Sequence, residues 1–418
     1  MENIKLKIQE LVKESKENIN CISYGYKFVN NIQTDELCIM YGVEKKKDIS
    51  ELLPNEIIPS TIEIDNLVLK TDVYTIEKTQ LISCFPLCSQ NAGANSIVNR
   101  SYTRPLVGGL SITSTNLVTT VGTLGFIGVH SSSQALVGVT NNHVLIQDAF
   151  YTGERNILGV LKNEYTPTDS VYQHGELGTI PPSNFTIGRT LRYAPIGQTL
   201  NNKVDCSIFS INENDIEPSA ISGSVMQAGE SYTQPLPFAT TAEIDNLLLS
   251  NPMIYSSGRT TGPKGGINCP VRIFALFTGF PIPYNKQGGQ TYVNFVDQIT
   301  FVKPENDPSL TTICPNPIIP GDSGSALIAE FPGGIRKIIG LVFAASTVSG
   351  IIYYGYANRI DNVALEMGIE AWDGTDKQYV DLNSIQYVTT LNGSMNKYIT
   401  CTGKQFWQVG LTTLNNPC

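Results

Sequence analysis

The stretch IIPGDSGSAL, residues 318–327, decides how this sequence is interpreted. Two glycines flank Ser323, Asp322 stands directly before it, and an apolar run follows. Small polar residues of this kind form tight turns between strands, which is the simpler interpretation. The alternative is that Ser323 is a nucleophile and that backbone N–H groups of the same turn stabilise an oxyanion. The second interpretation requires a base for the serine and a carboxylate that orients the base.

Histidine is the usual base for a serine, and the chain has three candidates. His130 is predicted at the end of a strand, before a surface turn. His174 is predicted in a polar loop. His143, in GVTNNHVL, stands between two apolar runs, where the end of a strand would hold it rigidly. We therefore expect His143 to be the base.

Asp205 is the expected orienting carboxylate. In NKVDCSIFSI it is a lone acid before an apolar strand, where a charge is costly unless it has a partner. Alone, the histidine and the aspartate more often have structural roles, in a core and at the start of a strand, and the serine motif fits an ordinary turn as readily as a catalytic one. The order His143, Asp205, Ser323 across two groups of strands favours a catalytic set, and it is one of three chain orders known for such triads.

The composition indicates a folded, mainly β protein. Of the 418 residues, 16% are charged and 41% are hydrophobic, and long helical patterns are scarce after residue 20. A chain of this length is expected to form two or three domains.

The charge of the chain argues against nucleic acid as a partner. The net charge is −9, and the basic run Lys45-Lys46-Lys47 is short. The first eighteen residues carry charges throughout and lack the apolar core of a secretory signal, so we expect a cytoplasmic protein. Residues 338–358 are long and uncharged enough to suggest a membrane span, but their glycines and serines favour two buried strands joined by a turn. No membrane partner is expected.

The nine cysteines are scattered, and we expect reduced thiols, with Cys206 in the core. Cys84 and Cys88 form one C-x₃-C pair without a second pair at zinc-finger spacing. We therefore expect no metal site and no cofactor.

The chain divides into four predicted segments. Residues 1–80 are expected to form a small α/β unit that begins with a helix over 4–17 and supplies no catalytic group. Residues 81–106 are a connector. Residues 107–372 hold two sets of short strands, which predict two packed β-barrels. Residues 373–418 form a strand-rich tail of unknown role.

These features resemble a known family. TNNHV and GDSGSAL are similar to motifs of trypsin-like serine peptidases with the chymotrypsin double-barrel fold. Within that group the chain most resembles the bacterial relatives of the plant NARROW LEAF 1 protein, over about residues 22–370. The shared motifs, in order, are RPLVGG (104–109), GTLG (122–125), NNHV (141–144), VDxxI (204–208), GRTTG (258–262), PGDSGS (320–325) and GLVFA (340–344).

The resemblance implies a role for each matching residue. Ser323 would be the nucleophile, His143 the general base and acid, and Asp205 its orienter. The N–H groups of Gly321 and Ser323 would form the oxyanion hole, and a glycine at 321 tolerates the backbone angles that this requires.

The resemblance also places the substrate. Phe343, Ala344 and Ala345 are expected on the strand that pairs with the substrate backbone. Pro317 stands six residues before Ser323, often the base of the specificity pocket in this fold, and the sequence has no acid between 308 and 321. A neutral or apolar pocket is therefore expected.

Asp322 is expected to support the loop of Ser323. Its charge needs a partner within the chain, which would make the enzyme active without processing. Arg259 of GRTTG is one candidate partner, and backbone N–H groups of residues 318–325 are the other.

The sequence thus predicts an intracellular serine endopeptidase that forms an acyl-enzyme and acts on protein or peptide substrates. The resemblance also implies a possible homo-oligomer. Two alternatives remain open: a catalytically quiet scaffold or binding module with a protease fold, and an esterase-type acyl hydrolase.

Overall fold

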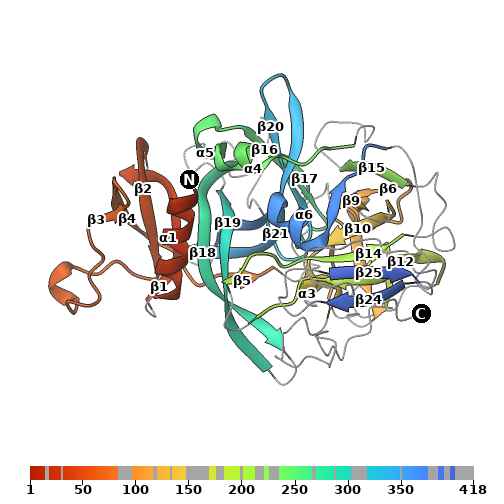
Figure 1. Ribbon diagram of the computed structural model, residues 1–418, viewed down its shortest axis with the longest axis horizontal. Coiled ribbons are helices and arrows are strands. Elements are labelled where there is room, and N and C mark those ends of the chain that lie inside the picture. Colours follow the sequence, from red (N-terminus) through yellow and green to blue (C-terminus); the bar gives the residue numbers. More distant parts are fainter. Residues whose placement is uncertain are drawn as a thin grey trace.

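The fold is mainly β, as the sequence predicts, and two large sheets carry it (Figure 1). The structure is a computed structural model. It describes residues 1–14, 18–29, 32–82, 97–115, 120–131, 134–146, 169–175, 183–197, 201–211, 221–225, 235–265, 270–286, 289–302, 318–348, 351–374, 385–389 and 396–400.

The larger sheet contains thirteen strands among the described residues. Its order is β17 (Gly262–Gly265), β16 (Met253–Gly258), β20 (Ala326–Phe331), β21 (Ile335–Val348), β22 (Ile351–Arg359), β19 (Gly289–Val302), β18 (Arg272–Lys286), β1 (Ile19–Val29), β2 (Ile32–Val43), β4 (Leu67–Thr75) and β3 (Thr61–Ile64). Two short strands join it from the side: β13 (Asn201–Asn202) on β19 and β5 (Gln80–Leu81) on β21. The predicted pair of buried strands over 338–358 is confirmed by β21 and β22.

The N-terminal residues belong to this same sheet. β1 pairs antiparallel with β18, with Ile22 opposite Gly279 and Gly25 opposite Ala275. Helix α1 (Glu2–Lys13) packs across β1, β18 and β19 (Figure 1). Residues 1–80 therefore share a sheet with the region 107–372, while the domain boundaries at 80, 106 and 372 stay predictions.

Helix α1 is shorter than predicted. It ends at Lys13, not at residue 17. Its buried face consists of Ile4, Ile8 and Val12, because residues four apart lie on one side of a helix. Leu6 lies between two of these residues in the sequence and is exposed.

Among the described residues, the smaller sheet has eight strands. It contains the first of the two predicted sets of short strands. Its order is β23 (Ile369–Ala371), β9 (Phe126–His130), β10 (Leu136–Thr140), β14 (Ser207–Ser210), β12 (Thr186–Tyr193), β11 (Ser170–Tyr172), β7 (Ser111–Ser114) and β8 (Gly122–Thr123). Two small sheets pair β6 (Leu106–Gly108) with β15 (Ile221–Val225), and β24 (Ile385–Thr389) with β25 (Asn396–Thr400). The two large sheets agree with the predicted double-barrel class.

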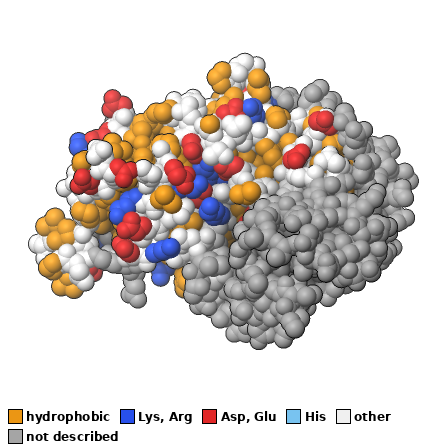
Figure 2. Space-filling model, viewed as in Figure 1, with side chains coloured by type: hydrophobic (Ala, Val, Ile, Leu, Met, Phe, Trp, Pro, Cys, Tyr) orange, Lys and Arg blue, Asp and Glu red, His pale blue; other side chains and the backbone are white. Residues whose placement is uncertain are grey.

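The remaining helices are short. They are α2 (Ile97–Arg100), α3 (Asn142–Leu145), α4 (Thr241–Asp245), α5 (Leu247–Ser250), α6 (Ile360–Met367) and the 3₁₀ turns η1 (Ile49–Glu51) and η5 (Ser183–Phe185). No helix of the described residues is long and apolar enough to cross a membrane. Figure 2 shows basic and acidic side chains interspersed on the face that it presents.

A buried ionic cluster ties α1 to the core. Asp297 of β19 is inaccessible to solvent, and its Oδ2 lies 2.7 Å from Lys5 Nζ of α1. Its Oδ1 lies 3.2 Å from Arg359 Nη1. Burial disfavours the charged guanidinium, but Asp361, Asp297 and Asp245 together raise the pKa of Arg359 above its usual value.

Candidate active site

His143 is positioned by the turn that follows β10. The strand ends at Thr140, and the single helical turn α3 begins at Asn142. Asn141 Nδ2 donates to the carbonyl oxygen of Asp205 at 2.6 Å, and Asn142 Nδ2 donates to the carbonyl oxygen of Ala194 at 2.6 Å. Both asparagines of the NNHV motif therefore anchor the turn that carries His143 to neighbouring backbone.

The three residues of the predicted catalytic set lie together. His143 Nδ1 lies 2.5 Å from Asp205 Oδ2, and His143 Nε2 lies 2.7 Å from Ser323 Oγ. All three side chains are buried. The imidazole thus bridges a carboxylate and a hydroxyl that stand before strands of different sheets, β14 and β20.

Asp205 is held in place by backbone groups as well as by the imidazole. Its Oδ1 accepts the N–H of Asn142 at 2.7 Å, and its own N–H donates to Asn358 Oδ1 at 3.0 Å. Asn358 Nδ2 in turn donates to Gln298 Oε1 at 2.7 Å. The bonds from Asn142 and His143 satisfy a carboxylate that would be costly to bury without partners, and the bond to Asn358 fixes the backbone beside it.

The other two histidines lie apart from Ser323. His130, expected before a surface turn, is buried, since β23 pairs with β9 and covers it. Burial, with a smaller contribution from the Arg192 cation, lowers the pKa of His130 to about 4. The His174 ring stacks on Phe185, with ring centroids 5.1 Å apart. Of the three histidines, all of them described, His143 is the one that contacts the serine.

The loop of Ser323 is fixed by Thr123 of β8. The Thr123 hydroxyl donates to the carbonyl oxygen of Gly321 at 2.9 Å, and its N–H donates to the carbonyl oxygen of Ser323 at 2.7 Å. Gly321 has a φ of 101°, a conformation that favours glycine. Gly324 has a φ of 92°, and an added Cβ there would lie 2.2 Å from the Thr123 carbonyl oxygen. The turn therefore depends on both glycines and on the adjacent sheet.

Asp322 is met by backbone N–H groups from two segments. Its Oδ1 accepts from Thr260 at 2.9 Å and from Thr261 at 3.0 Å, and its Oδ2 accepts from Ile319 at 3.0 Å. The structure thus places the second predicted partner, a backbone N–H of residues 318–325, on this carboxylate. The GRTTG turn contributes through its backbone, and an added Cβ on Gly258 would lie 2.1 Å from Asp322 Oδ1.

The pairing of Arg259 with Asp322 stays a prediction. Arg259 is buried in the same region, where its Nε donates to Ser111 Oγ at 2.8 Å and its backbone N–H donates to Thr123 Oγ1 at 2.9 Å. A second cation acts on Asp322. Burial lowers the pKa of Arg100, at the end of α2, and the charge of Asp322 opposes this lowering.

The predicted substrate strand lies within β21. Phe343, Ala344 and Ala345 are buried, and Ala344 and Ala345 face the short strand β5. Pro317, the expected pocket base, lies outside the described residues. Ile318, which follows it, is buried in the same apolar cluster as Val342 and Ala345.

Several residues of the site were missed by sequence reasoning. Thr123 belongs to GTLG and Asn141 and Asn142 to NNHV, so the motifs signalled these positions without indicating their function. Asn358 and Arg100 carry no such signal, because an isolated polar residue in the sequence does not reveal which carboxylate it faces.

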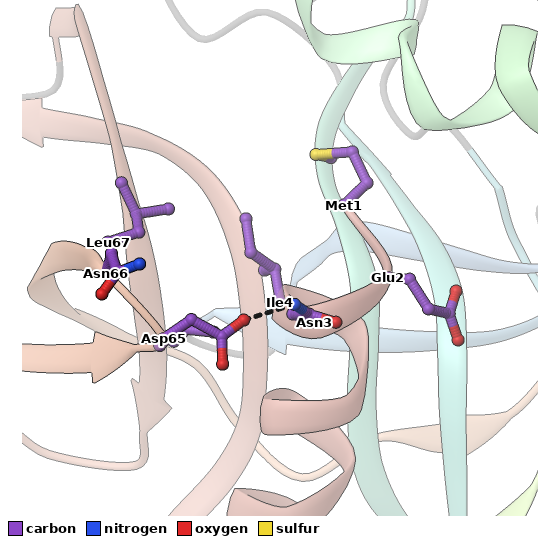
Figure 3. Close-up of a pocket in the computed structure, with 8 residues that line it drawn as sticks. Met1, Glu2, Asn3, Ile4, Asp65, Asn66 and Leu67 are labelled. Carbon is purple, nitrogen blue, oxygen red and sulfur yellow. Dashed lines mark hydrogen bonds between the residues drawn. The ribbon is translucent and has the colours of Figure 1, made fainter.

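The described residues contain no group of three or more side chains suited to holding a metal ion. Cys84 and Cys88 lie outside them. A surface pocket of about 620 Å³ lies where α1 begins, against the turn between β3 and β4 (Figure 3). There Asn3 Nδ2 donates to Asp65 Oδ2. This pocket contains none of the residues around Ser323.

Solved structures similar to this chain include bacterial serine proteases. A glutamic-acid-specific serine protease has a TM-score of 0.36 and 16% identity, covering 64% of this chain and all of its own. Nocardiopsis protease has a TM-score of 0.35 and 15% identity, covering 63% of this chain and 97% of its own. Cellulomonas bogoriensis chymotrypsin has a TM-score of 0.36 and 13% identity, covering 64% and 98%. A scan against protein families finds no match, and neither does a search of curated proteins.

Proposed function

We propose that this protein is a serine peptidase that cleaves peptide bonds through an acyl-enzyme on Ser323. The observation that carries the proposal is the position of one imidazole, 2.7 Å from Ser323 Oγ and 2.5 Å from Asp205 Oδ2. These distances are within the reach that general-base activation of a hydroxyl requires.

Acylation follows from this geometry. His143 Nε2 takes the hydroxyl proton as Ser323 Oγ attacks the substrate carbonyl carbon, and Asp205 stabilises the imidazolium that forms. The oxyanion is received by the N–H groups of Gly321 and Ser323, where each donor typically contributes about 3–4 kcal/mol to the transition state. The C–N bond then breaks, and His143 returns the proton to the leaving amine.

Deacylation repeats these steps with water. His143 takes a proton from the water as its oxygen attacks the ester carbonyl carbon. The bond to Ser323 Oγ breaks, the serine regains its proton from His143, and the acid product leaves. No cofactor or metal is needed to balance either step.

A peptide substrate is supported by the strand beside the serine. β21 runs past Ser323, since the N–H of Gly324 donates to the carbonyl oxygen of Val342, and its edge from Phe343 to Ala345 accepts an extended segment as an added strand. An ester substrate would use the same three side chains without needing this edge. We therefore favour peptide bonds over esters.

One observation favours the alternative of a catalytically quiet protein. The N–H of Gly321, proposed as an oxyanion donor, already donates to the carbonyl oxygen of Ile82 at 2.8 Å. A binding module with a closed site would have such a contact permanently.

Labelling with a fluorophosphonate probe tests the proposal. The probe should react with the intact protein, and the label should disappear in Ser323→Ala and fall strongly in His143→Ala. A peptide amide and its matching ester, compared on protein that has not reacted with the probe, separate a peptidase from an esterase. Labelling that persists in Ser323→Ala would contradict the proposal.

The kinship with bacterial relatives of the NARROW LEAF 1 protein, the cytoplasmic location and the homo-oligomer remain predictions from the sequence.

A further inference from the structure

A segment of this chain lies against the proposed substrate strand. β20 pairs with β21 only as far as Leu341, opposite Ala326, so the edge of β21 beyond this point is open to another strand. β5 fills it in antiparallel register, with Leu81 opposite Ala344 and Gln80 opposite Ala345.

Further hydrogen bonds extend this pairing on both sides of β5. The N–H of Ile82 donates to the carbonyl oxygen of Phe343 at 3.3 Å, and the N–H of Glu77 donates to the carbonyl oxygen of Thr347 at 3.0 Å. Between them, Thr79 Oγ1 lies 2.9 Å from Ser346 Oγ. Residues 77–82 are thus bound along the edge that an extended peptide substrate would use.

The carbonyl group of Ile82 contacts one of the two proposed oxyanion donors. Its oxygen accepts the N–H of Gly321 at 2.8 Å, two residues before Ser323. A strand that merely completed the sheet would need the pairing with β21 but not this second contact. The two contacts together are those of a peptide bound for attack.

The side chain of Ile82 occupies an apolar site. It is 3% exposed and belongs to the same buried cluster as Ile318 and Ala345. A charged side chain would be costly there without a partner. The surroundings therefore suit a branched aliphatic group.

We propose that residues 77–82 are a ligand of the chain's own substrate groove, and that the groove selects peptides with a branched aliphatic side chain at the residue whose carbonyl is attacked. This inference rests on the proposed function and names its substrate class. The enzyme was expected to be active without processing because the loop of Ser323 is held in place, as it is by Asp322 and Thr123. The substrate groove beside that loop is nevertheless filled by residues 77–82.

Ile82→Asp is the main test, because a carboxylate does not suit the apolar site and should release the segment. We expect the fluorophosphonate to label Ile82→Asp about tenfold faster than the unchanged protein. Ile49→Asp is the matched control, since Ile49 is 69% exposed in η1, and its labelling rate should equal that of the unchanged protein.

Thr79→Val guards against a folding defect in Ile82→Asp. The two side chains have nearly the same shape, so the change removes the hydrogen bonds of the hydroxyl, to Ser346 and to Tyr356, without a large change in volume. Labelling should rise a few-fold.

Substrate class is measured with two chromogenic amides on the Ile82→Asp protein. One carries the sequence of residues 77–82, Glu-Lys-Thr-Gln-Leu-Ile, and the other has Lys in place of the final Ile. The first should be cleaved roughly a hundredfold faster, as kcat/KM.

The outcomes separate the inference from the proposed function. Equal labelling of the unchanged protein, Thr79→Val and Ile82→Asp would overturn the occupied groove and leave the serine peptidase intact. Equal cleavage of the two amides would overturn the aliphatic selection. Absence of Ser323 labelling in every variant would remove the proposed function and, with it, this inference.

Discussion

The backbone N–H of Thr123 donates to the carbonyl oxygen of Ser323 at 2.7 Å. Thr123 belongs to the eight-stranded sheet, and Ser323 lies in the loop before β20 of the thirteen-stranded sheet. The conformation of the proposed nucleophile loop therefore depends on contact between the two sheets.

Replacing Thr123 by Val should slow the chemistry more than it weakens substrate binding. The change removes the hydroxyl that donates to Gly321 and accepts from Arg259, so the loop loses a support without losing volume. Small displacements of reacting groups are costly, and we expect kcat to fall about tenfold to a hundredfold. Peptide kinetics in the Ile82→Asp background measure this. Thr278→Val, whose hydroxyl contacts Thr300 in the larger sheet, is the control and should keep its kcat. A changed KM with an unchanged kcat would contradict the role.

Asp205→Asn should abolish most activity while the fold persists. The amide cannot stabilise the imidazolium as the carboxylate does, and kcat should fall about 10⁴-fold. Because the three residues act as one unit, Asp205→Asn combined with Ser323→Ala should be no slower than Ser323→Ala alone. Asp48→Asn, at an exposed turn, controls for the change of charge. A loss of less than tenfold in Asp205→Asn would argue against its assigned role.

His130 should make stability depend on pH in the mildly acidic range. Burial and the Arg192 cation lower its pKa from 6.5 to about 4, so at pH 5 the unfolded chain binds a proton that the folded chain does not. Stability is therefore lost as the pH falls from 6.5 to 4, by about 2 kcal/mol at pH 5 relative to pH 8. Urea unfolding of Ser323→Ala at the two pH values measures the loss. Adding His130→Gln should reduce it, and an unchanged loss would show that His130 is not responsible.

Asp297→Asn should destabilise the fold, because it leaves Lys5 and Arg359 without their shared buried carboxylate. We expect a loss of about 3–5 kcal/mol in the free energy of unfolding. Lys5→Met in the same chain should recover part of it, because Lys5 has lost its buried partner whereas Arg359 keeps Asp245 and Asp361. The control is Glu10→Gln, which breaks the exposed pair with Lys7 and should cost about 1 kcal/mol at most. Equal losses for Asp297→Asn and Glu10→Gln in urea unfolding would contradict a buried network.

The sequence predicted the parts of the site that short motifs carry. Ser323, His143 and Asp205 each lie in a short motif whose residue types indicate the chemistry. The alternation of apolar residues predicted the β class. The sequence also predicted His130 at the end of a strand, where β9 ends, but nothing local shows that β23, more than two hundred residues later, pairs with β9 beside a buried His130.

Contacts made through the backbone were beyond the reach of the sequence. The backbone N–H groups of Thr260 and Thr261 bind Asp322. Nearly every residue type has such a group, so the identity of the residue does not predict the contact. The same holds for the carbonyl oxygen of Ile82 on Gly321, which lies in a connector without periodicity. The end of α1 was misplaced, because a helical pattern of charges continues past Lys13 although the last apolar contact is Val12.

The short link between β4 and the groove has a kinetic consequence. β4 ends at Thr75, and Glu77 is already bonded to Thr347. A ligand tethered this closely acts at an effective concentration of the order of millimolar or more. A peptide added from solution competes with the tethered segment for the groove. Its apparent KM therefore rises in proportion to the ratio of occupied to free groove. A high KM measured on the unchanged protein would then report the length of this link, and the intrinsic affinity for a substrate would emerge only from a chain in which the segment is released.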